Sequence, residues 1–165
     1  MKRFPIRHTL REKDAKKVLE EFSKRVNIDI KQVFKAGLQM EIARERDMEI
    51  FIINGRPSLI KIGENLYPTL LFNDIFPFLA KIVVDSGAVP YICNGADVMA
   101  PGVVRVNGEF NEGELVLIID ERYEKPLAIG VALYDSKTLR KLKHGKVIKN
   151  VHYVTDRIWK LLKKL

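Results

Sequence analysis

The stretch from Val84 to Val103, VDSGAVPYICNGADVMAPGV, constrains the fold more than any other part of the chain. It places Gly87, Gly95 and Gly102 and two prolines among small apolar residues. Glycine serves where the backbone needs a positive φ or where another group must approach closely, and proline removes a backbone donor. We therefore expect tight turns around one short helical turn here, and not a regular strand or a long helix.

Charge is distributed unevenly along the chain, whose formal net charge is +8. Residues 1–35 hold 11 basic against 5 acidic residues (net +6), residues 36–135 hold 8 against 15 (net −7), and residues 136–165 hold 10 against 1 (net +9). Acidic residues interspersed in the first segment favour an ordinary solvated helix. The last segment favours a surface for a polyanion. An anionic membrane is the competing partner, but the mixed face of the last helix, with Trp159 expected to point inward, argues against it.

Composition excludes several classes of protein. With 165 residues, 47% hydrophobic and 30% charged, the chain can fold as one medium domain or two small ones. A single cysteine, Cys93, allows no internal disulfide, and three histidines without a Cys-x-x-Cys pair make a structural zinc site improbable. We expect no metal and no cofactor, no signal peptide, no membrane span, and a reduced, cytoplasmic setting.

The first half of the chain shows helical and then strand patterning. Thr9, followed three residues later by Glu12, predicts a capping box that opens a helix, and Asn27 ends that helix. Asn54-Gly55 predicts a hairpin turn between strands at residues 48–53 and 59–62.

The second half predicts many short strands separated by turn signals, which is typical of a small barrel-like β domain. Asn107-Gly108 predicts a second hairpin, and Ser136 and Asp156 are predicted helix caps. Pro77 argues against a continuous helix where the two patterns meet. We therefore expect an α+β chain with domains at residues 1–77 and 78–165.

No catalytic constellation stands out. Asp85 has no histidine, lysine or second carboxylate near it in sequence, so a helix-capping role is favoured over acid–base chemistry. Cys93 lies in an apolar context that favours a structural thiol over a nucleophile. The chain contains neither of two glycine motifs that bind phosphate groups, Gly-x-x-x-x-Gly-Lys-Ser/Thr and Gly-x-Gly-x-x-Gly. We expect a protein that is not an enzyme, with no catalytic residue and no small-molecule substrate.

The glycine-rich stretch resembles the signature of PUA domains, RNA-binding modules named for pseudouridine synthases and archaeosine transglycosylases. The resemblance is carried by Val84-Asp85-x-Gly87-Ala88, Gly95-Ala96-Asp97-x-Met99-x-Pro101-Gly102 and Ile129-Gly130-Val131. The tail, with Asn150-Val151-His152-Tyr153, and Tyr67-Pro68-Thr69-Leu70 before the domain resemble a narrower group. That group is the T-cell-amplified (malignant T-cell) ribosome-associated family and its archaeal relatives.

This resemblance implies an N-terminal α/β pre-PUA domain packed on a PUA pseudobarrel of about six mainly antiparallel strands. It also implies a non-enzymatic translation factor that binds the 3′ end of tRNA, small-subunit rRNA or both, in initiation, reinitiation or tRNA release. Eukaryotic members of the family work with a partner that carries an SUI-type domain. The glycine loop and the strand after it would lie near the RNA.

Other residues are candidates on their own chemistry. Tyr91 and Tyr153 can stack on bases, and Lys146 and Lys149 can contact phosphates. His152 either faces RNA or fills a barrel position, and the sequence does not decide between the two. The residues expected to face RNA are Gly87, Ala88, Tyr91, Asn94, Gly95, Ala96, Asp97, Met99, Lys146, Lys149, His152 and Tyr153.

An alternative hypothesis is an accessory RNA-binding subunit that delivers an RNA-modification enzyme to its substrate. Acidic residues of the middle segment would then form a protein-docking face. These residues are Glu109, Glu112, Glu114, Glu121 and Glu124.

Overall fold

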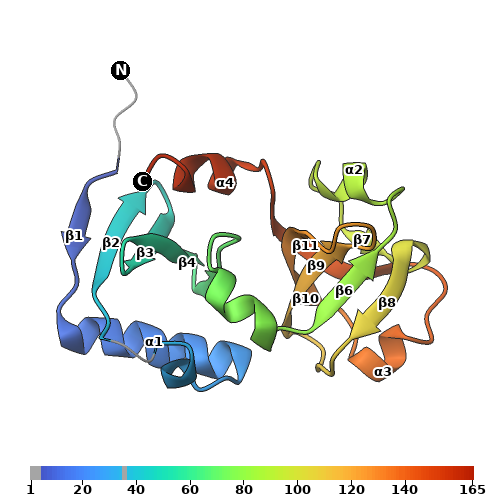
Figure 1. Ribbon diagram of the computed structural model, residues 1–165, viewed down its shortest axis with the longest axis horizontal. Helices are drawn as coiled ribbons and strands as arrows, with labels where there is room; N and C mark the ends of the chain where they lie inside the picture. The colour runs from blue at the N-terminus through green and yellow to red at the C-terminus, as the bar shows by residue number, and fades with distance from the viewer. Residues whose placement is uncertain (1–4, 35–36) are drawn as a thin grey trace. The chain divides into compact units, whose positions relative to one another are not determined.

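The computed structural model describes residues 5–34 and 37–165, and the chain divides into two compact units (Figure 1). One unit comprises the chain up to Ile75 together with Leu161–Leu165, and the other is Phe76–Lys160. The first holds a five-stranded sheet in the order β1-β2-β3-β4-β5, and the second a six-stranded sheet in the order β7-β11-β10-β9-β6-β8. The α+β fold class predicted from the sequence is confirmed.

Every neighbouring pair of strands in the first sheet is antiparallel. Its elements are β1 (Arg7–Thr9), α1 (Glu12–Val26), the 3₁₀ turn η1 (Ile30–Gln32), β2 (Met40–Glu45), β3 (Met48–Ile53), β4 (Arg56–Ile62) and β5 (Asn65–Pro68). Between β3 and β4, Asn54 and Gly55 have φ values of 50° and 83°. Two positive φ values are what a tight two-residue hairpin needs, so the predicted turn is confirmed.

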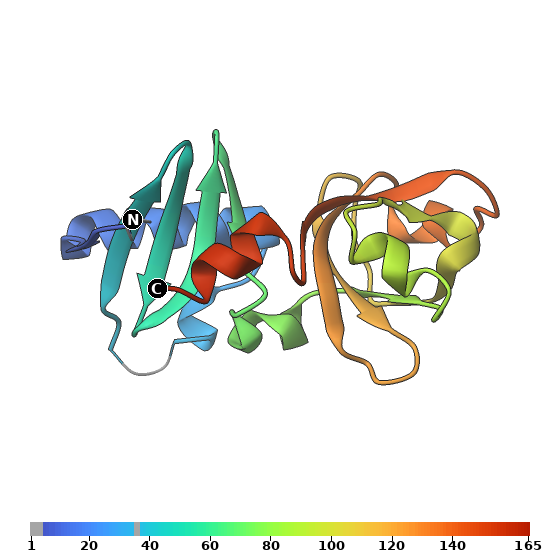
Figure 2. The same ribbon diagram turned by 90° about the horizontal axis from the view of Figure 1, so that it is seen from above.

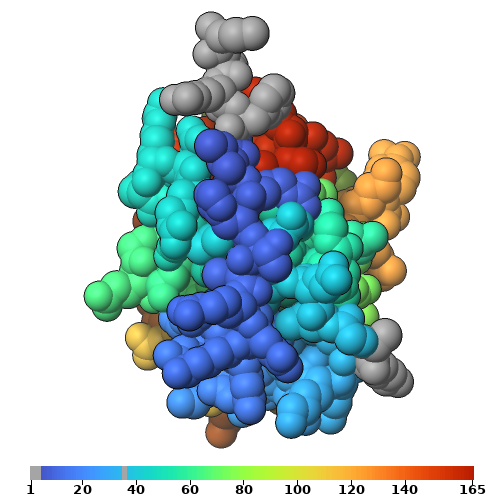
Figure 3. All heavy atoms as spheres, turned by 90° about the vertical axis from the view of Figure 1, so that its left-hand side faces the viewer, coloured from blue at the N-terminus to red at the C-terminus, as the bar shows by residue number. Residues whose placement is uncertain are grey.

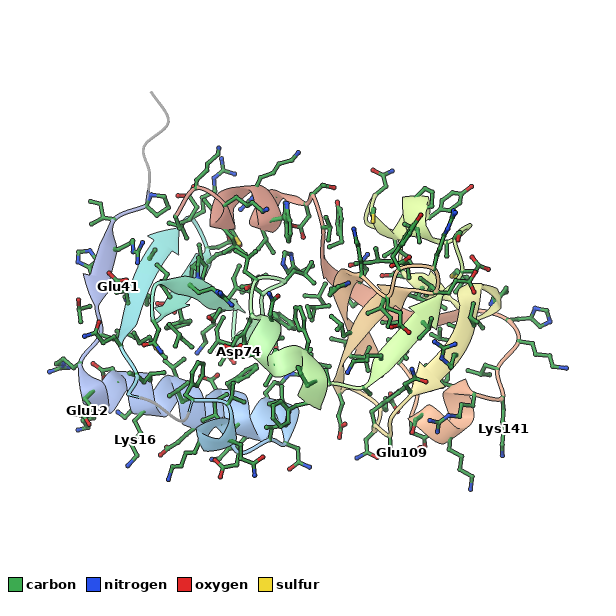
Figure 4. The ribbon with its side chains drawn as sticks, viewed as in Figure 1. Glu12, Lys16, Glu41, Asp74, Glu109 and Lys141 are labelled. Carbon is green, nitrogen blue, oxygen red and sulfur yellow. The ribbon has the colours of Figure 1, made fainter. Side chains whose placement is uncertain are left out.

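Helix α1 lies across one face of this sheet (Figure 2) and buries Ala15 and Phe22. The Phe22 ring centroid is 6.0 Å from that of Phe72, so the helix contributes an aromatic side chain to the core of the unit. Figure 3 shows the end of the first unit at which α1 begins, and Glu12 and Lys16 point away from the sheet in Figure 4. Amphipathic patterning of this kind explains why the segment is helical.

The predicted start of α1 is wrong, while its end is confirmed. Thr9 lies in β1, opposite Glu41 of β2, and the residue that precedes the helix is Arg11, whose side chain makes no capping bond. Pairing with β2 therefore overrides the local capping signal. At the other end, Asn27 adopts a left-handed conformation with φ 53° and donates its backbone N–H to the carbonyl of Ser23.

The second unit is built from short strands that curl around an apolar core. Its elements are β6 (Lys81–Val84), α2 (Val89–Ile92), β7 (Val98–Met99), the 3₁₀ turn η3 (Ala100–Gly102), β8 (Val103–Asn107), β9 (Leu115–Asp120), β10 (Pro126–Ala132), α3 (Ser136–Leu139) and β11 (Lys146–Tyr153). The 3₁₀ helix η2 (Asn73–Phe78) precedes β6, and α4 (Arg157–Leu162) follows β11. Strands β6 and β9 are parallel, and the other pairs are antiparallel.

The hairpin predicted at Asn107-Gly108 is wrong, because β8 pairs with β6 and not with β9. Asn107 lies opposite Lys81, and the chain then turns away at Gly108, whose φ is +105°. A Cβ atom at Gly108 would lie 3.0 Å from the Cβ of Ala80, so the glycine also allows a close approach. A turn signal in the sequence thus marks a turn without specifying which strand pairs next.

Of the helix caps predicted at Ser136 and Asp156, the one at Asp156 is confirmed. Asp156 accepts a hydrogen bond of 2.7 Å from the backbone N–H of Trp159 at the start of α4. The cap of α3 is Asp135, which accepts from the N–H of Thr138 at 2.7 Å, and not Ser136. The buried Ser136 hydroxyl instead donates to Glu109, which lies beside α3 in Figure 4.

Gly130 is the position where the barrel has least room for a side chain. Its Cβ would collide with Cγ2 of Ile148 and lie 3.0 Å from the backbone oxygen of Lys149. The β10–β11 register shifts at Ile129/Gly130. The glycine therefore lets two strands approach where the sheet bends.

We expect Gly130→Ala to lower the free energy of unfolding by about 1–3 kcal/mol, the usual effect of overpacking a tight site. Urea unfolding followed by circular dichroism measures it. Gly37→Ala is the control, because no described atom lies within 4 Å of its Cβ position. Equal stability of the two variants would contradict the steric role of Gly130.

Candidate functional site

The glycine-rich loop, α2 and η3 enclose a pocket of about 450 Å³ in the second unit. Its wall includes Ile92 and Val98 from the core and Pro101 and Gly102 from η3. Six residues expected from the sequence to face RNA also line it: Gly87, Ala88, Tyr91, Ala96, Asp97 and Met99. The tertiary fold thus brings together the two parts of the signature that the sequence separates.

The shape of the loop depends on Asp85 and on small residues. One carboxylate oxygen of Asp85 accepts from the backbone N–H of Ala88 at 2.8 Å, and its own N–H donates to the carbonyl of Gly102 at 3.0 Å. A Cβ at Gly102 would lie 3.2 Å from the Cβ of Ala88. Asp85 therefore closes the turn before α2. Its predicted helix-capping role is wrong, because the residue that precedes the helix is Ala88 and no side chain caps that end.

The rim of the pocket carries two exposed apolar side chains. Tyr91 is 68% exposed and Met99 is 48% exposed, which is high for residues of this size. Lys146 lies opposite Met99 in the β7–β11 pair, and Lys149 is exposed farther along β11. An apolar opening bordered by cations can accept a flat apolar group that carries negative charge.

Asp97 connects the pocket wall to β11. Its carboxylate accepts from the backbone N–H of Asn150 at 2.7 Å and forms an ion pair of 2.9 Å with Lys146. Burial raises the pKa of Asp97, but the hydrogen bonds from Lys146 and from the Asn150 N–H lower it by more, so the net shift is downward. Asp97 is therefore a structural anion, and its charge offsets that of Lys146.

Asn150 strengthens the same connection. Its side-chain amide donates to the carbonyl of Ile92 at 3.1 Å and to that of Ala96 at 3.0 Å. These bonds hold the end of α2 and the following turn against β11. The sequence prediction did not assign Asn150 to the site, although its position next to Lys149 in the C-terminal motif was the signal that could have identified it.

Gly95 and Tyr153 lie against each other outside the pocket lining. Gly95 has φ +95°, and its Cβ would lie 3.3 Å from the ring of Tyr153. Tyr153 is half-buried and packs against the core, and its stacking on a base stays a prediction. Asn94 is exposed beside them and does not line the pocket.

His152 does not face solvent, which corrects its assignment to an RNA-facing surface. Its side chain is fully buried, and Nδ1 lies 2.8 Å from a carboxylate oxygen of Asp156. Burial raises the pKa of Asp156, but the hydrogen bond and charge of His152 and the N–H groups of Trp159 and Tyr153 lower it on balance. Of the two alternatives for His152, the barrel interior is the one observed.

Other chemistry is limited in the parts of the chain that the structure describes. Over residues 5–34 and 37–165, no cluster of three or more His, Cys, Asp or Glu side chains has the arrangement of a metal site. None of the helices in those ranges has the length and apolar composition to cross a membrane. Burial raises the pKa of the Cys93 thiol, which lowers the share of reactive thiolate.

The acidic residues proposed as a docking face fall into two groups along the chain. Glu109, Glu112 and Glu114 precede β9, whereas Glu121 and Glu124 follow it, so the two groups lie at opposite ends of a six-residue strand. Glu109 is also engaged by Arg140 at 2.8 Å. The acidic docking face therefore stays a prediction, with its residues in two groups joined by one short strand.

Comparison with known proteins identifies both halves of the chain. Residues 80–154 match the model of the PUA domain, and residues 6–73 match that of a domain of unknown function, DUF1947. An uncharacterized protein of Methanocaldococcus jannaschii is 38% identical over 157 residues, which cover 93% of this chain and 94% of that protein. Malignant T-cell-amplified sequence 1 of Danio rerio is 30% identical over 141 residues, covering 81% of this chain and 78% of that protein.

A third relative and two crystal structures extend the comparison. Translation machinery-associated protein 20 of Schizosaccharomyces pombe is 24% identical over 164 residues, covering 96% of this chain and 91% of that protein. A PUA domain structure from Aeropyrum pernix, in complex with tartrate, has a TM-score of 0.83 at 30% identity and covers 96% of this chain and 91% of that one. A hypothetical protein of Pyrococcus horikoshii has a TM-score of 0.81 at 32% identity, covering 95% and 99%.

The depressed pKa of Asp97 predicts a pH dependence of stability. Because the pKa is lower in the folded protein, the stabilisation from Asp97 is fully present above its unfolded value of about 3.9 and is lost as the pH falls through the folded value. We expect the free energy of unfolding of the wild type to fall more steeply below about pH 4 than that of Asp97→Asn.

Chemical denaturation at a series of pH values measures this difference. Glu112→Gln, which removes an exposed carboxylate, provides the control. At pH 7, Asp97→Ala should be less stable by about 1–3 kcal/mol, because the Asn150 N–H loses its acceptor. Parallel profiles for the wild type and Asp97→Asn would show that the ion pair contributes nothing.

Proposed function

Because the chain belongs to the malignant T-cell-amplified family of PUA-domain proteins, we propose that it is an RNA-binding protein that acts with the translation machinery. The observation that carries this proposal is the open apolar pocket on the glycine-rich loop, with Tyr91 and Met99 at its rim. A relative across nearly the whole chain is named as translation machinery-associated, which supports the same assignment.

The pocket has the size and lining that a nucleotide base needs. Its volume of about 450 Å³ falls within the usual range of ligand pockets, roughly 300–1,000 Å³. Small residues at Gly87 and Ala88 leave the backbone within reach of a ligand, and Tyr91 offers an exposed ring for stacking. Lys149, which is exposed on β11, supplies a cation for a phosphate group.

We further propose that the RNA is the 3′ end of tRNA, small-subunit rRNA, or both. The protein would act in the cytoplasm as a binding protein that catalyses no reaction. The 3′ end of tRNA is single-stranded, so its bases are free to enter a pocket. The site we propose has two parts. The border of the pocket holds Asn94, Gly95, Lys146 and Lys149, and the pocket itself is lined by Gly87, Ala88, Tyr91, Ala96, Asp97 and Met99. A protein partner with an SUI-type domain belongs to the same proposal.

Binding of tRNA with and without its terminal CCA tests the tRNA version. Fluorescence anisotropy at low salt should show weaker binding once the CCA end is removed. Equal affinities would refute the tRNA-end version, and the absence of any binding to tRNA or to the small subunit would refute the proposal as a whole. Affinity purification should recover small-subunit proteins and an SUI-domain protein; recovery of an RNA-modification enzyme would favour the accessory-subunit alternative.

We expect Tyr91→Ala to weaken RNA binding by about 5- to 150-fold, because stacking on an aromatic side chain contributes about 1–3 kcal/mol per base. Tyr134, which is 40% exposed and does not line the pocket, provides a matched control in Tyr134→Ala. Anisotropy titrations measure both variants. An equal loss of RNA affinity in both variants, or no loss in either variant, would count against the pocket as the binding site.

Salt dependence distinguishes phosphate contacts from stacking. Lys149→Ala should reduce the slope of log K against log salt by about 1, as expected for the loss of one phosphate contact. Lys24→Ala, which removes an exposed cation from α1, should leave the slope unchanged. A wild-type slope in Lys149→Ala would place the phosphates elsewhere on the molecule.

A further inference from the structure

The turn between β9 and β10 gathers exposed basic and aromatic side chains outside the pocket. Tyr123 is 65% exposed, with the guanidinium carbon of Arg122 5.3 Å and Nζ of Lys125 5.8 Å from its ring centroid. Arg105 of β8 reaches the same turn, where its Nη2 lies 4.0 Å from an Oε1 of Glu124. We call Arg105, Arg122, Tyr123 and Lys125 the turn cluster.

The backbone of this turn is held rigidly. The two carboxylate oxygens of Asp120 accept from the N–H groups of Tyr123 and Lys125 at 2.8 Å and 2.7 Å. Glu124 adopts a left-handed conformation with φ 54°, and its N–H donates to the Asp120 carbonyl at 3.0 Å. Tyr123 is therefore presented to solvent on a fixed support, which lowers the entropy lost when a ligand stacks on it.

The turn lies at the same end of the sheet as the pocket. Val84 and Asp120 are partners in the parallel β6–β9 pair, and the N–H of Glu121 donates to the Val84 carbonyl at 2.9 Å. Asp85, the next residue after Val84, already lines the pocket. The chain thus brings the turn alongside the first residue of the glycine-rich loop, and Figure 2 shows the orange β9–β10 turn projecting from the second unit.

We infer that the turn cluster is a second RNA contact, which stacks a base of the strand that continues beyond the nucleotides in the pocket. This inference rests on the proposed function and extends it to a longer stretch of RNA. A single exposed tyrosine is ordinary in a folded protein. Exposed aromatic rings combined with basic side chains are one means by which proteins bind single strands, and this ring lies at the same end of the sheet as the proposed RNA pocket.

Charge indicates which interaction dominates in the cluster. Within residues 121–125, Arg122 and Lys125 are balanced by Glu121 and Glu124, and Arg105 brings the net charge only to +1. The ion pair between Arg105 and Glu124 also offsets part of the charge that Arg105 adds. Stacking on Tyr123 is therefore the main contribution, and its loss should change affinity without changing the salt dependence of binding.

The test compares two single-stranded RNAs that share the same CCA 3′ end, one of about 4 and one of about 16 nucleotides, lengths that span the site sizes of small single-strand-binding domains. The full-length protein is titrated with each RNA at several salt concentrations. Tyr123→Ala should bind the short RNA as the wild type does and the long RNA about 5- to 150-fold more weakly, with an unchanged salt slope. Tyr123→Phe, which keeps the ring, should restore wild-type binding.

Tyr91→Ala separates failure of this inference from failure of the proposed function. Tyr91→Ala could lose binding of the short RNA while Tyr123→Ala binds both RNAs as the wild type does. That result would overturn the inference about the turn cluster and would leave the proposed pocket supported. An equal loss for both RNAs in Tyr123→Ala would also overturn it, because the contact would not lie beyond the pocket. If the wild type bound neither RNA nor the small subunit, the proposed function itself would fail. A protein-binding role for the turn would leave both RNA affinities unchanged.

Discussion

Asp97 joins the loop that forms the pocket to the last strand of the barrel, through Asn150 at 2.7 Å and Lys146 at 2.9 Å. Asn150 returns two hydrogen bonds to the backbone on either side of that loop. Ile92 and Val98 of this segment pack into the core, and the polar bonds add connections between its backbone and β11.

Close contacts between small residues also determine the shape of the loop. Ala88 and Gly102 approach so closely that a Cβ on the glycine would lie 3.2 Å from the alanine. This contact brings the two halves of the loop together while leaving the pocket open on its outer side. Such close packing leaves little room for larger side chains, and it keeps the backbone within reach of a ligand. At the barrel interior Gly130 has the same role between β10 and β11.

Local signals in the sequence were reliable at three sites where one turn or cap decides the structure, although the cap of α3 is Asp135 and not the predicted Ser136. Asn27 ends α1, Asn54-Gly55 turns the first hairpin and Asp156 caps α4, because each depends on the conformation or hydrogen bond of a single residue. Signals that compete with strand pairing failed. Thr9 joined a strand in place of a cap, since its backbone pairs with a segment more than thirty residues away. Asn107-Gly108 likewise marked a turn but not its partner strand.

The sequence by itself determined the fold class, the signature residues and the basic C-terminal segment, because composition and spacing carry that information directly. Only the tertiary structure decided which signature residues share a pocket. It turned His152 into the barrel beside Asp156, placed the Tyr153 ring against Gly95, and set Tyr123 beside the loop through the parallel β6–β9 pair. The physical reason is that side-chain direction on a curled sheet depends on register and bulges, which arise from contacts between distant residues.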